Sequence, residues 1–419
     1  MPHRNSPPQP QSLDQPRQGP RPLPMHLGLA VSTWMSSRTA LPLWKSGSLD
    51  WKPDLRAPAE NLRQQLNGAA NNGFDAALDA EIRRRLDAFL AGIERYRRHA
   101  YRRDLADPPV LWREGTTRLL DYGYGNKGGV PVFVVPSLVN RYYVLDLSAR
   151  CSLIRHMAGA GLRPLVVDWD RPGETERDFT LTDYIAGRLE AAFDAAATAT
   201  GGPLAIMGYC MGGNLALALA LRRQDTVSRL ALLATPWDFH ADNPAEAQAL
   251  AAGMTPFFPL VDGLGEMPVD LLQVLFSALD PYLAVKKFLT FGRLDPGSAK
   301  AAHFVALEDW LNDGVPLAAA VAHECLTGWY GNNGPAAGGW QIAGAPVRPQ
   351  DLDRPALAII PAQDRIVPPA SATALADAIP GCERMTPALG HIGMVVGGSA
   401  PKVVWAPLVD WLRCNAALA

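Results

Sequence analysis

The sequence contains few cysteines and places none of them in a pairing or metal-binding pattern. Its 419 residues include five cysteines, which stand singly, without a C-x-x-C pair or a Cys/His cluster. An odd number of isolated cysteines does not make a disulfide framework, and zinc sites need thiolates and imidazoles at short spacing. We therefore expect reduced cysteines, a cytoplasmic location, and neither a metal nor a resident cofactor.

Net charge and long apolar runs are also lacking. Charged residues make up 19% of the chain and the formal net charge is −2, which argues against nucleic acid as the main partner. No run approaches the roughly 18 apolar residues of a transmembrane helix. The first residues are rich in Pro, Gln, Arg and Ser and lack the apolar core of a signal peptide. With 48% hydrophobic residues, the sequence predicts a globular protein without a transmembrane segment.

The chain ahead of the core falls into two parts. We interpret residues 1–70 as a Pro-rich, disordered and irregular segment, in which residues 25–55 form either a strap over the core or an interfacial anchor. Residues 71–109 are predicted to form an amphipathic helix region, because apolar side chains recur every three or four residues from 74 to 98 among several arginines. Such a helix packs against its own domain or lies on a lipid surface.

Strands and helices alternate from about residue 110. Apolar runs predict strands at 118–122, 130–135, 163–169, 204–207, 229–234 and 355–361. Helices are expected at 152–160, 182–199, 214–221, 371–378 and 401–413. The alternation predicts a doubly wound, mostly parallel α/β sheet formed by residues 110–239 and 351–419. Residues 240–350 interrupt it with helical pieces, aromatics and Gly/Pro breaks, so we expect an inserted helical cap there.

One short motif lies at the centre of this core. The stretch Gly208-Tyr209-Cys210-Met211-Gly212-Gly213 follows a predicted strand, precedes a predicted helix and has the form of a nucleophile elbow with Cys in place of Ser. The flanking glycines would let strand and helix approach closely, and the helix N-terminus would favour a thiolate. A buried structural cysteine is the ordinary alternative.

A thiol nucleophile needs a base, and the base needs a carboxylate to orient it. In the α/β-hydrolase fold these groups follow in the order nucleophile, acid, histidine. Asp364 follows the strand at 355–361, and His391 lies in the last loop. Each alone could be an ordinary loop residue, but the three in this order predict a Cys210/His391/Asp364 triad.

Other candidates fit this order less well. Asp168 and Asp238 precede the predicted cap and Asp242 lies at its very start. The remaining histidines lie before the core, on helices, after the elbow or in the cap. The oxyanion hole should use two backbone N–H groups. We assign them to Met211, directly after the nucleophile, and to Val139 in the loop after the strand at 130–135.

From about residue 110 to 413 the chain resembles the polyhydroxyalkanoate synthases, a family of the α/β-hydrolase superfamily. The Cys elbow carries the likeness together with several further stretches: Val135–Leu147, Val167–Trp169, Thr180–Ile185, Thr235–His240, Leu307–Asn312, Trp329–Asn333, Asp364–Pro368 and Gly390–Gly393. The Gly-His-Ile-Gly form resembles the short synthases that work with a second subunit. The N-terminal segment is longer than in those and shorter than in the long, self-sufficient synthases, so the need for a second subunit stays open.

The resemblance implies an acyltransferase that moves (R)-3-hydroxyacyl groups from CoA thioesters, through an acyl-Cys210, to a growing polyester. The CoA thioester is then the substrate, the partner is a second copy or a second synthase subunit, and the polyester granule surface is a place of action. The cap would exclude water and act as a lid or channel.

Two alternatives are left open. A cysteine-dependent hydrolase, whether an acyl-CoA thioesterase or a polyhydroxyalkanoate depolymerase or esterase, would use the same residues with water as the acceptor. A non-catalytic granule protein would use the N-terminal segment as its anchor and would have no need of the triad.

Overall fold

The computed structural model describes residues 17–68 and 73–414, which divide into two compact units. The helical unit comprises the chain up to residue 101 together with residues 280–312. The sheet unit comprises residues 102–279 and the chain from residue 313 onward. No described helix combines the length and the apolar character needed to cross a membrane.

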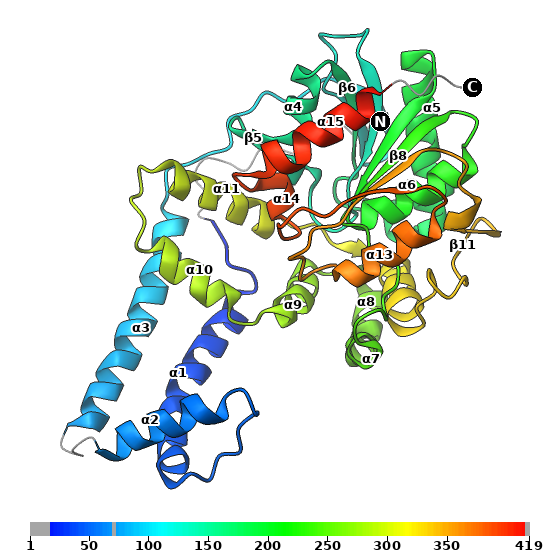
Figure 1. Ribbon diagram of the computed structural model, residues 1–419. Coiled ribbons are helices and arrows are strands. Elements are labelled where there is room, and N and C mark those ends of the chain that lie inside the picture. Colours follow the sequence, from blue (N-terminus) through cyan, green and yellow to red (C-terminus); the bar gives the residue numbers. More distant parts are fainter. Residues whose placement is uncertain (1–16, 69–72, 415–419) are drawn as a thin grey trace. The chain divides into compact units, whose positions relative to one another are not determined.

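The helical unit corrects the prediction of an irregular segment. Its helices are α1 (Leu23–Ser46), α2 (Arg56–Gly68), α3 (Phe74–Arg97), α10 (Leu283–Phe291) and α11 (Ala299–Asn312) (Figure 1). Helix α1 contains Pro42 and Gly28, whose low helix propensity suggested an irregular chain. Burial of His26 and Ala30 and a left-handed Gly47 cap stabilise the helix nevertheless.

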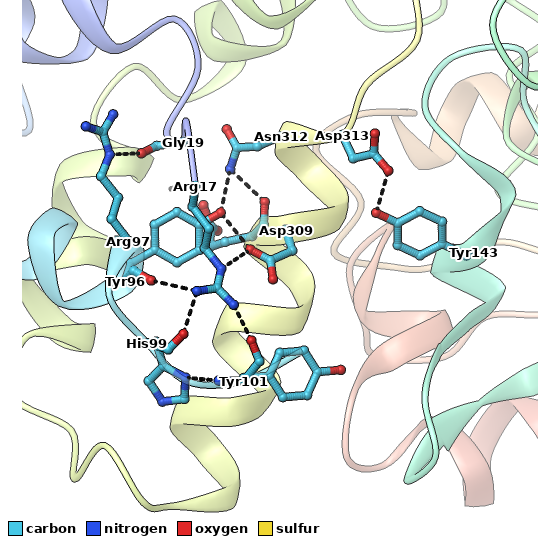
Figure 2. Close-up of polar contacts among 11 residues, drawn as sticks. Arg17, Gly19, Tyr96, Arg97, His99, Tyr101, Tyr143, Asp309, Asn312 and Asp313 are labelled. Carbon is cyan, nitrogen blue, oxygen red and sulfur yellow. Dashed lines mark hydrogen bonds and ion pairs between the residues drawn. The ribbon is translucent and has the colours of Figure 1, made fainter. Parts of the chain in front are cut away.

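Residues 17–22, which we predicted to be disordered, are held by polar contacts within this unit, whereas residues 1–16 lie outside the described residues. The guanidinium of Arg17 donates to Asp309 at 2.6 Å and to the carbonyl of His99 at 2.6 Å (Figure 2). Arg97 donates to the carbonyl of Gly19 at 3.0 Å. Asn312 accepts from the N–H of Arg21 at 2.8 Å.

Part of the predicted cap belongs to the helical unit. Phe288 of α10 packs edge-on against Phe89 and Tyr96 of α3, with ring centroids 6.4 Å and 5.6 Å apart. Residues 280–312 therefore share a core with the N-terminal helices. The prediction of a single cap over 240–350 was wrong in this respect. The aromatic residues that Phe288 packs against are distant in sequence, so the spacing of residues in the sequence does not reveal them.

The rest of the predicted cap stays in the sheet unit. Ahead of residues 280–312 it forms α7 (Pro244–Met254), η4 (Thr255–Phe257), α8 (Phe258–Leu264), β9 (Glu266–Met267) and α9 (Val269–Leu279). After residues 280–312 it forms β10 (Leu317–Ala318), α12 (Ala319–His323), η5 (Glu324–Gly331), β11 (Gln341–Ile342), β12 (Ala345–Pro346) and η6 (Pro349–Asp351).

The predicted doubly wound sheet is confirmed. It has eight strands in the order β1-β2-β6-β3-β7-β8-β13-β14. The bounds are β1 (Val110–Glu114), β2 (Thr117–Asp121), β3 (Val130–Val135), β6 (Leu162–Asp168), β7 (Leu204–Tyr209), β8 (Val227–Leu233), β13 (Ala356–Ile359) and β14 (Glu383–Met385). Pairing is parallel from β6 to β14 and antiparallel where β1, β2 and β6 meet. Every residue of β7 is buried, so both faces of this strand are covered, as in sheets that carry helices on each side.

The remaining elements of the sheet unit are mostly connections and covering helices. They are η1 (Tyr142–Leu145), β4 (Asp146–Ser148), β5 (Cys151–Ser152), α4 (Leu153–Gly159), η2 (Glu176–Asp178), η3 (Asp183–Leu189), α5 (Glu190–Thr200), α6 (Met211–Arg222), α13 (Pro369–Ala378), α14 (Gly393–Val396), η7 (Pro401–Trp405) and α15 (Ala406–Arg413). Because β3, β6, β7, β8 and β13 are parallel, the loops after them all leave one edge of the sheet, where open α/β sheets place their sites.

Two glycines in the helical unit give a matched test of its packing. A Cβ on Gly92 of α3 would lie 2.3 Å from the carbonyl oxygen of Phe288, whereas a Cβ on Gly28 of α1 meets nothing within 4 Å. We expect Gly92→Ala to lower the free energy of unfolding by about 1–3 kcal/mol through overpacking. Gly28→Ala should raise it by about 0.5–1 kcal/mol, because alanine loses less backbone entropy in a helix. Urea unfolding followed by circular dichroism measures both, and equal changes would contradict the close contact of α3 with α10.

Candidate active site

Cys210 lies at the apex of a sharp turn between β7 and α6. Its backbone has φ 55° and ψ −131°, a conformation that costs a non-glycine residue on the order of 1–3 kcal/mol. The N–H of Cys210 donates to the carbonyl of Leu233 at 2.8 Å, and its own carbonyl accepts from the N–H of Gly213 at 2.9 Å. The turn is therefore held on both sides by backbone hydrogen bonds, and it has the geometry of a nucleophile elbow.

The three glycines of the motif are required by close approach. A Cβ on Gly208 would lie 2.5 Å from the Cα of Gly213. A Cβ on Gly212 would lie 2.2 Å from the carbonyl oxygen of Val135, and one on Gly213 would lie 1.9 Å from Oγ1 of Thr235. The N-terminus of α6 thus lies directly against the ends of β3 and β8, which brings the loops after those strands beside Cys210.

Asp364 and His391 lie together at the same edge. The loop after β13 carries Asp364, and the loop before α14 carries His391; both side chains are buried. Nδ1 of His391 and Oδ2 of Asp364 are 2.7 Å apart. The other carboxylate oxygen, Oδ1, accepts from the N–H groups of Ile366 and Val367 at 2.8 and 2.9 Å. These bonds fix the carboxylate, and the carboxylate in turn orients the imidazole.

The imidazole of His391 also interacts electrostatically with the thiol of Cys210. Since Nδ1 faces Asp364, Nε2 is the ring nitrogen that serves Cys210. Burial by itself lowers the pKa of His391, but the negative charge of Cys210 and the hydrogen bond of Asp364 outweigh it and raise the pKa to about 10. The structure therefore brings the three predicted residues into one connected array.

Tyr209 braces this array from the neighbouring strand. Its hydroxyl donates to the backbone carbonyl of His391 at 3.3 Å, and the two rings lie with centroids 5.2 Å apart. The sequence analysis did not single out this residue, because nothing in a G-x-C pattern indicates what the intervening side chain touches.

The rival residues have other partners. Asp168 accepts from Arg118 at 3.1 Å, and Asp238 accepts from the amide of Asn333 at 2.8 Å. A nitrogen of the His240 ring lies 2.8 Å from the carbonyl oxygen of Tyr330. The contacts of Asp238 and His240 tie the loop after β8 to the segment around η5. These two residues therefore have a structural role and do not replace Asp364 and His391 beside the thiol.

The two predicted oxyanion donors differ in their surroundings. Met211 begins α6, and the first N–H groups of a helix have no intrahelical acceptor. The N–H of Val139, in contrast, donates to Oγ of Ser137 at 3.0 Å. This contact is a local turn of the kind that serine forms with the residue two positions on, and the sequence analysis did not foresee it.

An aromatic group from the predicted cap lies near Cys210. Phe239 packs against Trp329 with the rings tilted and against Tyr330 edge-on, at centroid distances of 5.5 and 4.9 Å. Burial raises the pKa of Tyr330, and the negative charge of Cys210 raises it further, which indicates that the phenol lies near the thiol. The sequence showed these aromatics but not which of them approach the nucleophile. Among the described residues, no group of three or more His, Cys, Asp or Glu side chains is arranged to hold a metal ion.

Comparisons with known proteins agree with the fold. A family model described as alpha/beta hydrolase fold matches residues 130–397, more than half of the chain. The poly(3-hydroxyalkanoate) polymerase subunit PhaC of Allochromatium vinosum is 31% identical over 289 residues, which cover 68% of this chain and 81% of that protein. The subunit of the same name from Thiocystis violacea is 30% identical over 306 residues, covering 71% and 85%. That of Haloarcula marismortui is 28% identical over 316 residues, covering 72% of this chain and 66% of the relative.

The raised pKa of His391 predicts how stability depends on pH. A histidine whose pKa is higher in the folded than in the unfolded state stabilises the fold fully below the ordinary value of 6.5, and this contribution is lost as the pH rises through about 10. We expect the difference in free energy of unfolding between the wild type and His391→Gln to shrink over that range. Urea unfolding at a series of pH values measures it.

The matched control for this prediction repeats the comparison in a Cys210→Ala background. Because the charge of Cys210 helps to raise the pKa of His391, its removal should move the decline to lower pH. A difference in unfolding free energy that stays constant from about pH 6 to about pH 11 would contradict the raised pKa of His391.

Proposed function

This chain belongs to the poly(3-hydroxyalkanoate) polymerase family, with the α/β-hydrolase fold, and on that basis we propose that it transfers (R)-3-hydroxyacyl groups from CoA thioesters to a growing polyester through an acyl-cysteine at Cys210. One observation carries the assignment of the nucleophile. A strained cysteine at the elbow interacts electrostatically with a buried histidine, which is itself held by a buried aspartate.

The first half-reaction forms the acyl-enzyme. Nε2 of His391 takes the Sγ proton of Cys210, and the thiolate attacks the carbonyl carbon of the thioester. The N–H of Met211 stabilises the tetrahedral oxyanion together with a donor from the loop after β3, for which Val139 remains our proposal. The intermediate collapses with cleavage of the carbon–sulfur bond to CoA, and the CoA thiolate leaves with the proton from His391.

The second half-reaction extends the polyester. The hydroxyl of a bound hydroxyacyl group gives its proton to His391 and attacks the carbonyl carbon of the acyl-Cys210. An ester bond forms, the bond from carbon to Sγ breaks, and the leaving thiolate of Cys210 takes the proton from His391, which restores the starting state. Asp364 keeps the imidazole oriented and stabilises its protonated form in both steps.

A cysteine suits this reaction because the first step exchanges one thioester for another at little free-energy cost. The acyl-enzyme then has to persist until a hydroxyl arrives, so water must be kept from it. The aromatic residues around Tyr330 support this requirement, since Phe239 and Trp329 pack together with Tyr330, whose phenol interacts electrostatically with Cys210. We include in the proposal that CoA enters only as substrate, that no cofactor takes part, and that the enzyme works on the surface of its insoluble product.

The test incubates the purified chain with (R)-3-hydroxybutyryl-CoA and measures free CoA and the acyl product together. We expect CoA release with formation of insoluble polymer or oligoester. CoA release with only free 3-hydroxybutyrate would replace the polymerase with a thioesterase. Repeating the assay with longer acyl groups, and with a candidate second subunit added, separates chain-length preference and subunit dependence from absence of activity.

Variants of the array give the second part of this test. Cys210→Ala and His391→Ala should abolish CoA release, and Cys210→Ser should leave weak activity at most, because a serine hydroxyl has a much higher pKa than a thiol. Asp364→Asn should lower kcat by about 1,000-fold or more, since the amide favours the wrong histidine tautomer. A Cys210→Ala variant with near-wild-type turnover would remove Cys210 from the mechanism.

A further inference from the structure

The loop after β3 continues into an arginine that is held between two carboxylates. The guanidinium of Arg141 lies 2.9 Å from Oδ1 of Asp170 through Nη1 and 3.0 Å from Oδ1 of Asp313 through Nε. Oδ2 of Asp313 accepts from the hydroxyl of Tyr143 at 3.0 Å (Figure 2). All four residues belong to the sheet unit, although they come from three separate stretches of the chain. We call Arg141, Asp170 and Asp313 the arginine clamp.

The clamp lies next to strained backbone on two sides. Asn140, which precedes Arg141, has φ 65°, and Asp170 has φ 54°. Neither residue is glycine, so both occupy the left-handed region at a steric cost that the surroundings must offset. Asp170 is further fixed by its N–H, which donates to Oδ1 of Asp168 at 3.2 Å, and Asp168 accepts in turn from Arg118. The guanidinium therefore links two loops that each contain a non-glycine residue in the left-handed region.

The stretch that ends in Asn140 is the stretch that faces the elbow. Its beginning, Val135 and Pro136, is so close to Gly212 that no Cβ fits between them. Its N–H groups include that of Val139, one residue before the strained Asn140. The direction of these N–H groups is set by the backbone at both ends of the stretch, by β3 on one side and by the clamp on the other.

We propose that Arg141 is a positioning residue for the reaction, and that its attachment to Asp170 and Asp313 holds the 136–140 loop in the orientation that supplies the second oxyanion donor. The inference rests on the proposed function, because it requires a carbonyl whose oxygen becomes negative at this place. Arg141 itself takes no part in bond making. It acts through the backbone of the residues before it.

The decisive measurement compares two reactions of the same thiol. Attack of Cys210 on a thioester produces an oxyanion, whereas alkylation of Cys210 by iodoacetamide displaces iodide from a tetrahedral carbon and produces none. Arg141→Met should therefore lower kcat for CoA release from (R)-3-hydroxybutyryl-CoA by about 100-fold, the effect of misplacing one oxyanion donor, with KM changed by about twofold or less. The rate of Cys210 alkylation should stay within about twofold of the wild type.

A matched control and two further variants sharpen the result. Arg222 pairs with Glu190 at 2.5 Å and has a side-chain exposure of 27%, against 28% for Arg141, but it lies in the last turn of α6. Arg222→Met should leave both reactions unchanged. Arg141→Lys keeps the positive charge but cannot span two carboxylates with a planar fork, so it should lose an intermediate amount of kcat and serves if the methionine variant folds poorly. Adding Asp313→Asn to Arg141→Met should not lower kcat further, because both substitutions act through one clamp.

Three outcomes would overturn the inference. If Arg141→Met and Arg141→Lys release CoA at the wild-type rate, the clamp does not position the donor, and the proposed function is untouched. If alkylation falls together with CoA release, the variant has disturbed the elbow and not the loop. If the wild type releases no CoA from any acyl-CoA tested, the proposed function fails first and this inference falls with it.

Discussion

The close approach of α6 to the ends of β3 and β8 is the constraint on which the rest of the site depends. Three glycines make this approach sterically feasible, and at each of them any side chain would collide with backbone or with Thr235. Because of it, the strained backbone of Cys210 lies where its N–H donates to Leu233 of β8 and its carbonyl accepts from Gly213 of α6. The thiol is thereby presented at the sheet edge to which the parallel strands also deliver the loops of Asp364 and His391.

Burial and charge oppose each other at this edge, and charge prevails. A buried imidazole on its own favours the neutral form, so burial would lower the pKa of His391. The charge of Cys210 and the carboxylate of Asp364 reverse this and raise that pKa to about 10. Two backbone N–H groups donate to the carboxylate of Asp364 and hold it in place beside the imidazole. The array is thus a connected set, and removing Cys210 or Asp364 changes the pKa of His391.

Local patterns in the sequence were sufficient for the sheet and for the three residues of the array. The β-branched run at 130–135 and the motif around Cys210 depend only on neighbours in sequence, and the order of Asp364 and His391 follows from the fold. What escaped prediction depends on distant partners. Phe288 packs with Phe89 and not with the cap, and α1 forms in spite of Pro42 because its buried face has a helix to pack against. The edge strands β1 and β14 are short and carry mostly exposed residues, so neither has the long apolar run of a buried central strand.

The hydrogen bond from Val139 to Ser137 bears on how such a loop favours a transition state over a ground state. In the structure the Val139 N–H is satisfied by a neutral hydroxyl at 3.0 Å. An uncharged thioester oxygen is a similar acceptor and would gain little by displacing it. An oxyanion is a much stronger acceptor, since charge-assisted hydrogen bonds are roughly twice as strong as neutral ones. On the proposed mechanism, the donor is therefore released from Ser137 mainly when negative charge develops, which is the differential binding that accelerates a reaction. A loop held rigidly on both sides, by β3 and by the arginine clamp, can make this exchange through a small reorientation without losing its place beside the thiol.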